Sequence, residues 1–209
     1  MPRQVDHEER RRVIAEAVCA LADERGLEGV TVRDVADRAQ ISMGAVQRCF
    51  RTKEEMLVFA LAHVGERIGE RVRARLVRTP AQSAATALGH AAAEVSLLGE
   101  EHRAEARVWL AFVAQAVVSA PLAETLRAGY APLEDAFARL IEEGAVRGAG
   151  EPAGEDAPLD ARREARTVLA LADGLTVHVL AGHLTPQEAG DVLHAHLARL
   201  WAGRQPPPA

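Results

Sequence analysis

The chain has 209 residues and a mass of 22.4 kDa, with 48% hydrophobic and 26% charged residues. This composition is ordinary for a folded globular protein, so disordered, collagen-like and coiled-coil classes are excluded. The formal net charge of −5 does not suggest a nucleic-acid partner, and any such function must rest on a local basic patch.

The sequence carries no sign of membrane insertion or export. No apolar run approaches the roughly 18 residues that a membrane-spanning helix needs, and the first residues, MPRQVDHEERRR, are polar rather than of signal-peptide type. Cys19 and Cys49 form neither a redox motif nor a zinc-ligand set. We therefore expect a cytoplasmic protein with no membrane contact and no cofactor. No metal is expected either, and metal sensing by the histidines near the C-terminus is only a minor alternative.

Long stretches rich in Ala, Leu, Glu and Arg, with apolar residues returning every three or four positions, predict an all-α chain. The expected helices cover approximately residues 6–25, 32–39, 43–49, 53–78, 80–98, 101–119, 121–147, 160–182 and 186–203. Four helix starts carry capping signals, at Thr31–Asp34, Thr52–Glu55, Thr79–Gln82 and Thr185–Glu188. Composition predicts a linker or mobile loop over 148–158 and a disordered tail over 204–209.

The stretch from Thr31 to Lys53 predicts a helix-turn-helix. Two very short helices share a tight joint at residues 39–41, and Ser42 is placed to cap the second helix. Gly44 lies inside that second helix, where glycine costs up to about 1 kcal/mol relative to alanine, so its presence favours a close approach by DNA backbone. A surface that faces phosphates needs positive charge that no nearby acid neutralises. Residues 38–53 contain no acidic residue and four basic ones, Arg38, Arg48, Arg51 and Lys53.

Residues 10–57 resemble the N-terminal domain of TetR-family transcriptional regulators. The matching positions are Ile14-Ala-x-Ala17, Leu21, Glu24-x-Gly26, Gly29-x-Thr31, Arg33-Asp34-Val35-Ala36, Ala39-x-Ile41-Ser42-x-Gly44, Phe50 and Lys53-Glu54-Glu55-Met56-Leu57. Ala172-Asp173-Gly174-Leu175, with His178 and Leu184-Thr185-Pro186, is similar to the ligand-sensing domain of the BetI-type subgroup. The resemblance implies an all-α fold, with a helix-turn-helix DNA-binding domain over 1–57 and a helical ligand-sensing and dimerisation domain over 58–203.

The resemblance also implies roles for individual residues. Thr31 and Arg33 would lie at the DNA backbone, and Lys53 would contact a phosphate. The residues that would enter the major groove are Ser42, Met43, Gly44, Ala45, Gln47 and Arg48. The chemistry of Arg48 agrees, because its fork fits guanine O6 and N7. Arg33, Arg38 and Arg51 could equally be solvated surface cations, and for Arg38 we favour that interpretation.

Two positions depart from the family pattern, which usually has aromatic residues where this chain has Gln47 and Cys49. Gln47 can still donate to a phosphate or pair with adenine, so the departure predicts weaker phosphate anchoring or a different base preference. Cys49 is expected to pack as a small hydrophobe.

The C-terminal part shows no catalytic signature and no metal-spaced set of histidines, so we expect no enzyme activity. Its few aromatic residues are concentrated on two successive predicted helices. Ordinary core packing is the first interpretation, and an apolar pocket with a few polar anchors is the second. The candidate ligand-binding residues are Trp109, Phe112, Gln115, Tyr130 and His178.

The last two predicted helices combine apolar stripes with small residues. Paired with the same helices of a second chain, they would form a four-helix bundle, although packing within one chain is the simpler alternative. A dimer is favoured because one recognition helix rarely secures an operator. The candidate interface residues are Val168, Leu171, Leu175, Val179, Leu193 and Leu197.

These observations predict a regulator, most simply a repressor, that binds a palindromic double-stranded DNA operator as a homodimer and responds to a small hydrophobic effector. A ligand-independent architectural DNA-binding protein is the alternative within the same class. A helical enzyme is disfavoured because no acid, base or nucleophile set is present, and a mere scaffold is disfavoured by the acid-free basic stretch.

Overall fold

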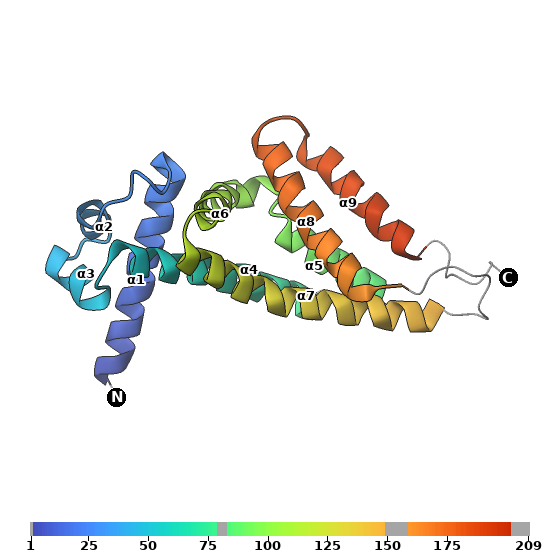
Figure 1. The fold of residues 1–209 in the computed structure, drawn as a ribbon, viewed down its shortest axis with the longest axis horizontal. Helices are drawn as coiled ribbons and strands as arrows, with labels where there is room; N and C mark the ends of the chain where they lie inside the picture. Colours follow the sequence, from blue (N-terminus) through green and yellow to red (C-terminus); the bar gives the residue numbers. More distant parts are fainter. Residues whose placement is uncertain (1, 79–82, 149–158, 202–209) are drawn as a thin grey trace. The chain divides into compact units, whose positions relative to one another are not determined.

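The computed structural model describes residues 2–78, 83–148 and 159–201, and within these ranges all regular secondary structure is helical (Figure 1). The all-α prediction is confirmed. The helices are α1 (Pro2–Arg25), α2 (Val32–Arg38), α3 (Met43–Cys49), α4 (Lys53–Arg78), α5 (Ala84–Val95), the 3-10 helix η1 (Glu100–His102), α6 (Arg103–Ala116), α7 (Ala120–Gly148), α8 (Ala161–Leu180) and α9 (Pro186–Trp201). None of these described helices is long and apolar enough to cross a membrane.

Capping signals in the sequence locate several helix starts correctly. Thr31 accepts a hydrogen bond from the Asp34 amide at 3.2 Å, and Thr52 accepts one from the Glu55 amide at 3.0 Å. In the described residues α5 begins at Ala84, and Ser83 caps it by accepting from the Thr86 amide. The signal at 79–82, most of the predicted linker and the 204–209 tail lie outside the described residues.

The start of α9 has a complete capping box. The Thr185 hydroxyl oxygen accepts from the Glu188 amide at 3.2 Å, and the Glu188 carboxylate accepts from the Thr185 amide at 2.8 Å. The hydrogen bond from the Thr185 amide, and then one that the Thr185 hydroxyl donates to the same carboxylate at 2.8 Å, hold the pKa of Glu188 below its ordinary value. The box therefore fixes the position of this helix start and favours the charged form of Glu188.

Contacts divide the chain into two compact units. Unit 1 comprises residues 1–67 and 103–129, and unit 2 comprises residues 68–102 and 130–209. Unit 1 draws on both sequence-predicted domains, whereas unit 2 contains no residue of the predicted 1–57 domain. The predicted boundary after residue 57 stays a prediction.

In unit 1, α2 and α3 pack against each other and against α1, which also packs against α6 (Figure 1). The apolar interior of unit 1 contains buried side chains from α1, α3 and α4. They are Ile14, Val18, Leu21, Val46, Met56 and Leu61. The helical periodicity seen in the sequence therefore corresponds to one apolar interior behind the helix-turn-helix.

The turn between α2 and α3 is closed by two backbone hydrogen bonds. The Ile41 amide donates to the Ala36 carbonyl at 3.0 Å, and the Gln40 amide donates to the Asp37 carbonyl at 3.2 Å. This is the Schellman pattern, which requires a left-handed residue at the turn. Gln40 fills that place with φ = 55° although it is not glycine.

In unit 2, α8 and α9 form a helical hairpin that packs against α5 (Figure 1). The buried Thr176 hydroxyl on α8 lies 2.6 Å from the Ser96 carbonyl oxygen, at the end of α5, and 2.9 Å from the Ala172 carbonyl oxygen. Gly144 on α7 makes room for Trp201 of α9, because a Cβ there would collide with the indole ring.

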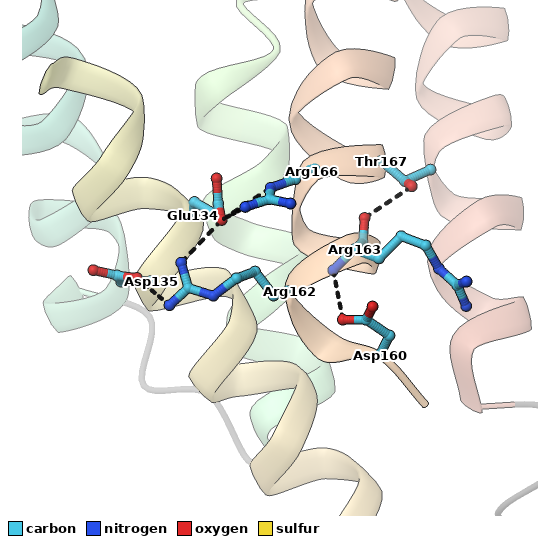
Figure 2. Close-up of polar contacts among 7 residues, drawn as sticks. All are labelled: Glu134, Asp135, Asp160, Arg162, Arg163, Arg166 and Thr167. Carbon is cyan, nitrogen blue, oxygen red and sulfur yellow. Dashed lines mark hydrogen bonds and ion pairs between the residues drawn. The ribbon is translucent and has the colours of Figure 1, made fainter. Parts of the chain in front are cut away.

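An ion-pair network joins α7 to the start of α8 within unit 2 (Figure 2). Arg162 donates to Glu134 at 3.0 Å and to Asp135 at 2.9 Å, and Arg166 donates to Glu134 at 3.1 Å. The guanidinium of Arg166, then that of Arg162, lowers the pKa of Glu134. The carboxylate of Glu134 is thus shared by two arginines one turn apart on α8.

Candidate functional site

The outward face of α3 carries the side chains best placed to contact a partner. Met43 is 50% exposed, although it is a large apolar residue, and Gln47 and Arg48 are exposed one turn later. Ser42 accepts from the Ala45 amide at 3.2 Å and so fixes the start of this helix, as the sequence predicts.

The opposite face of α3 packs into unit 1. Ala45, Val46 and Cys49 are buried there, with Ala45 only 8% exposed. The expectation that the Ala45 side chain faces the DNA groove is therefore wrong, because that side of a two-turn helix is covered by α1 and α2. Cys49 packs as a small hydrophobe, as expected.

Basic side chains around the helix-turn-helix fall into paired and unpaired groups. Arg38 donates two hydrogen bonds to the Glu24 carboxylate, at 2.8 and 2.6 Å, which agrees with its interpretation as a solvated surface cation. The exposed guanidinium groups of Arg48 and Arg51 have no acidic partner in the described part of the chain. Arg33 differs, because it helps the hydrogen bond from Thr31 to lower the pKa of the neighbouring Asp34. Positive charge is therefore uncompensated on α3 and at its flanks.

Gly44 is not required by the packing of this chain. A Cβ at that position would meet only the Arg48 guanidinium, at the ordinary contact distance of 3.7 Å. The cost of a glycine inside α3 is thus not offset by any close approach within the chain. This agrees with the idea that a partner molecule approaches the helix at this position.

Lys53 begins α4 and is half-buried, with its Nζ 3.5 Å from the Leu27 carbonyl oxygen that accepts from it. It lines a shallow hollow of about 270 Å³ within unit 1 together with Glu54, Leu57, Gln115, Ser119 and Leu122. The expected phosphate contact is compatible with this position, because an ammonium group has three donors and one is engaged here.

The candidate ligand residues are divided between the units. Trp109 and Phe112 are buried in unit 1, as the core interpretation expects, whereas Gln115 lines the hollow beside Lys53. In unit 2, Tyr130 donates its hydroxyl to the Asp173 carboxylate. Burial, and then the Asp173 charge, raises the Tyr130 pKa well above its ordinary value.

His178 is exposed near the end of α8, where its ring centroid lies 4.8 Å from that of His183. Among the residues that the structure describes, no three His, Cys, Asp or Glu side chains form a group that could hold a metal ion.

The expected dimer-interface residues lie mostly inside one chain. Five of the six are buried within unit 2, and Leu171 is half-buried. The buried residues pack within the chain, where α5, α8 and α9 cover one another, so they have little surface left for a second copy. The assignment of Leu171 to the interface stays a prediction. The five buried residues are Val168, Leu175, Val179, Leu193 and Leu197.

One basic residue of the site has no signal in the sequence pattern. Arg11 of α1 lies against the rings of Phe50, which caps the C-terminal end of α3, and Phe59 of α4. Nothing local to residue 11 marks this contact, because both partners are distant in the chain.

Family models match both parts of the sequence. The model described as "Bacterial regulatory proteins, tetR family" matches residues 14–58, and the model described as "BetI-type transcriptional repressor, C-terminal" matches residues 84–202. The chain is 33% identical over 183 residues to the HTH-type transcriptional regulator PksA of Bacillus subtilis, covering 86% of this chain and 83% of PksA. It is 46% identical to the HTH-type transcriptional repressor KstR of Rhodococcus jostii over 63 residues, 30% of each chain.

Solved structures show the same architecture. A transcriptional regulator of Rhodococcus sp. RHA1 is 30% identical with a TM-score of 0.79, covering 95% of this chain and 99% of that one. A regulator of Saccharomonospora viridis, solved in complex with choline, is 24% identical with a TM-score of 0.77, covering 91% and 96%. The second likeness concerns the fold alone.

Proposed function

Because the chain belongs to the TetR family of DNA-binding transcriptional regulators, we propose that it represses transcription by inserting the exposed face of α3 into the major groove of its operator. The observation that carries the proposal is the outward face of α3, where Met43, Gln47 and Arg48 are exposed and Arg48 has no acidic partner in the described chain. A short helix with this face and a capped start is suited to base-edge contacts.

Each proposed contact has its own chemistry. The Arg48 fork pairs with guanine O6 and N7, and Gln47 donates to a phosphate or pairs with adenine. Lys53 contacts phosphate as a point charge, and Thr31 and Arg33 lie at the backbone beside α2. Gly44 lets the DNA backbone come close to α3. Ser42 acts chiefly by capping the helix that presents these groups.

Fluorescence anisotropy with duplexes from the intergenic DNA upstream of the gene tests this interface. We expect Arg48→Ala to weaken operator binding by about 1–3 kcal/mol and to relax the preference at one base pair per half-site. Lys53→Ala should weaken binding to all duplexes alike and reduce the salt dependence. Arg38→Ala is the matched control, since Arg38 is engaged by Glu24; equal effects of all three variants would refute the placement of α3 in the groove.

We propose a homodimer that reads a palindromic operator through two copies of α3. The second copy would cover the exposed side of the α8–α9 hairpin rather than its buried stripe. Small and apolar residues are exposed there, with Val177 at 46% and Val192 at 43%, accompanied by Ala170, Ala195 and Ala198. Such residues allow helices of two copies to approach closely.

Analytical ultracentrifugation tests the dimer face. Val177→Glu and Val192→Glu should shift the protein toward monomer and weaken operator binding. Val77→Glu is the control, because Val77 is 79% exposed but belongs to α4. A wild-type monomer at micromolar concentration, or dimers in all three variants, would contradict the proposed face.

We propose that a small hydrophobic effector releases the DNA. The effector would bind better to a conformation in which the helix-turn-helix segments of the dimer are displaced from the operator. Support comes from two separate places, one in each unit. In unit 1, Gln115 lines the hollow beside Lys53, and Trp109 and Phe112 are buried apolar side chains of the same unit. In unit 2, the Tyr130 hydroxyl, which donates to Asp173, is a polar group that could orient a ligand. To convert a 99:1 population into 1:99, the effector must favour the released form by about 5.5 kcal/mol. Apolar burial supplies this more readily to a drug-sized molecule than to a small ion.

A screen of hydrophobic metabolites by thermal shift and DNA release tests the effector proposal on wild type, Trp109→Ala and Tyr130→Phe. Compounds that release DNA from wild type but not from a stably folded variant would support the assigned region. Compounds that act equally on all three proteins would place the sensor elsewhere. A regulator that keeps its DNA with every compound would favour the ligand-independent alternative.

A further inference from the structure

Arg11 of α1 lies on an aromatic platform at the end of the recognition helix. Its guanidinium carbon is 4.8 Å from the ring centroid of Phe50 and 4.3 Å from that of Phe59. The two ring centroids are 5.5 Å apart, with the ring planes inclined at 49°. The cation thus faces two rings at once, which restricts its rotamers and lowers the entropy cost of any further contact.

The guanidinium group of Arg11 has unused hydrogen-bonding capacity. No acidic side chain pairs with it in the described chain, and its Nε is buried without a hydrogen-bond partner. Its two terminal nitrogens also make no hydrogen bond within the described chain, and the residue as a whole is half-buried. The neighbouring Arg12 differs, because it is exposed and lies 3.9 Å from the Glu8 carboxylate.

The platform places this cation beside the DNA-contacting helix. Phe50 is the C-cap of α3, so a guanidinium group held against its ring lies next to the C-terminal end of that helix. Arg48 and Arg51 flank the same end and are exposed without acidic partners in the described chain. Because Nε is buried, the edge formed by the two terminal nitrogens is the one that remains to bind a pair of phosphate oxygens.

We propose that Arg11 is a phosphate-contacting residue of the DNA interface, held ready by the rings of Phe50 and Phe59. This inference rests on the proposed function and adds to it a contact from α1, outside the helix-turn-helix. The contact is independent of base sequence and adds affinity through counterion release. The rings act as positioning residues, since they touch the cation and not the DNA.

The test compares Arg11→Met with Arg12→Met. Methionine keeps helix propensity and packs well on aromatic rings, so it removes the charge while preserving the platform. Arg12 is the matched control, because it lies one residue, about 100°, around the same helix and is paired with Glu8. Affinity is measured from 50 to 300 mM KCl on the upstream duplex and on a scrambled duplex, and thermal unfolding of each variant is recorded.

We expect Arg11→Met to reduce the slope of log affinity against log salt by about 0.9 per protomer, or about 1.8 for a dimer. At 150 mM salt this corresponds to an affinity loss of about fivefold per contact and about 30-fold per dimer, on both duplexes alike. Arg11→Lys should keep the slope, because it keeps the charge. Arg12→Met should leave the slope unchanged.

The proposal would be overturned if Arg11→Met left the slope of log affinity against log salt unchanged. A loss of affinity together with thermal stability, at an unchanged slope, would mean that Arg11 only stabilises the fold by packing on the two rings. An equal change in Arg12→Met would also overturn it. A wild-type protein that binds both duplexes equally would contradict operator recognition by α3, whereas the slope on the scrambled duplex would still decide the role of Arg11.

Discussion

Replacing Gln40 by glycine should stabilise the protein. Gln40 occupies the left-handed position of the α2–α3 turn with φ = 55°, and its side chain is exposed. Its amide donates to the Asp37 carbonyl, and that bond is kept in any residue other than proline. Glycine can adopt the same backbone conformation without the clash of a Cβ atom.

The magnitude follows from two opposing terms. A left-handed conformation costs an L-residue about 1–2 kcal/mol, and glycine returns about 0.5–1 kcal/mol of this through the larger entropy of its unfolded chain. No hydrogen bond of the Gln40 side chain within the described structure is lost. The expected net gain is about 0.5–1 kcal/mol, which raises Tm by about 1–4 °C in a chain of this length.

Two control variants make the measurement specific. Gln40→Ala removes the same side chain but keeps the Cβ, so its stability should stay within about 0.5 kcal/mol of wild type. Leu97 has a similar backbone, with φ = 50°, but is only 3% exposed. Leu97→Gly should therefore destabilise, because the lost burial, about 2–3 kcal/mol, exceeds the relief of strain.

Equilibrium unfolding in urea, followed by circular dichroism, gives the three differences in unfolding free energy. A Gln40→Gly variant that is less stable than both wild type and Gln40→Ala would refute the reasoning. That result would mean that the turn is not held in the left-handed conformation in solution.

Two further predictions concern unit 2. Thr176→Val should lower the free energy of unfolding by about 1–3 kcal/mol, because the buried Ser96 carbonyl loses its donor; a change below 0.5 kcal/mol in urea unfolding, taken as about half the lower bound, would contradict this. Glu188→Gln should destabilise at neutral pH but not in acid. The folded pKa of Glu188 is lowered by the Thr185 hydrogen bonds, so its contribution is present above the ordinary pKa of 4.5 and is lost as pH falls through the folded value. The difference between wild type and Glu188→Gln should shrink below pH 4.5, and a difference that grows there would contradict the sign.

Local signals made the helix-turn-helix predictable. Thr31 and Ser42 cap α2 and α3 where the sequence places them, because an N-cap is decided by residues within one turn. The side of α3 that is buried is decided by α1 instead. The assignment of Ala45 to the DNA side therefore failed, although the limits of α3 were correct.

Long-range partners made the rest unpredictable. Helical periodicity identified the apolar stripe that includes Val168 and Leu175, but the same stripe fits a partner helix from its own chain or from a second one. The structure shows the first case. Arg11 was missed because its partners, Phe50 and Phe59, lie about 40 residues away or more. The turn at Gln40 lacks the glycine that usually marks it.

The placement of the aromatic side chains gives the protein intrinsic optical reporters. The chain has two tryptophans and one tyrosine, with Trp109 in unit 1 and both Trp201 and Tyr130 in unit 2. In a Trp201→Phe variant, indole fluorescence therefore reports on unit 1 alone. Because burial and the contact with Asp173 raise the pKa of the Tyr130 phenol, tyrosinate absorbance at a pH just above the ordinary value of 10.0 should increase when unit 2 opens. One denaturation experiment read at both signals thus measures whether the two units unfold together, without an attached dye.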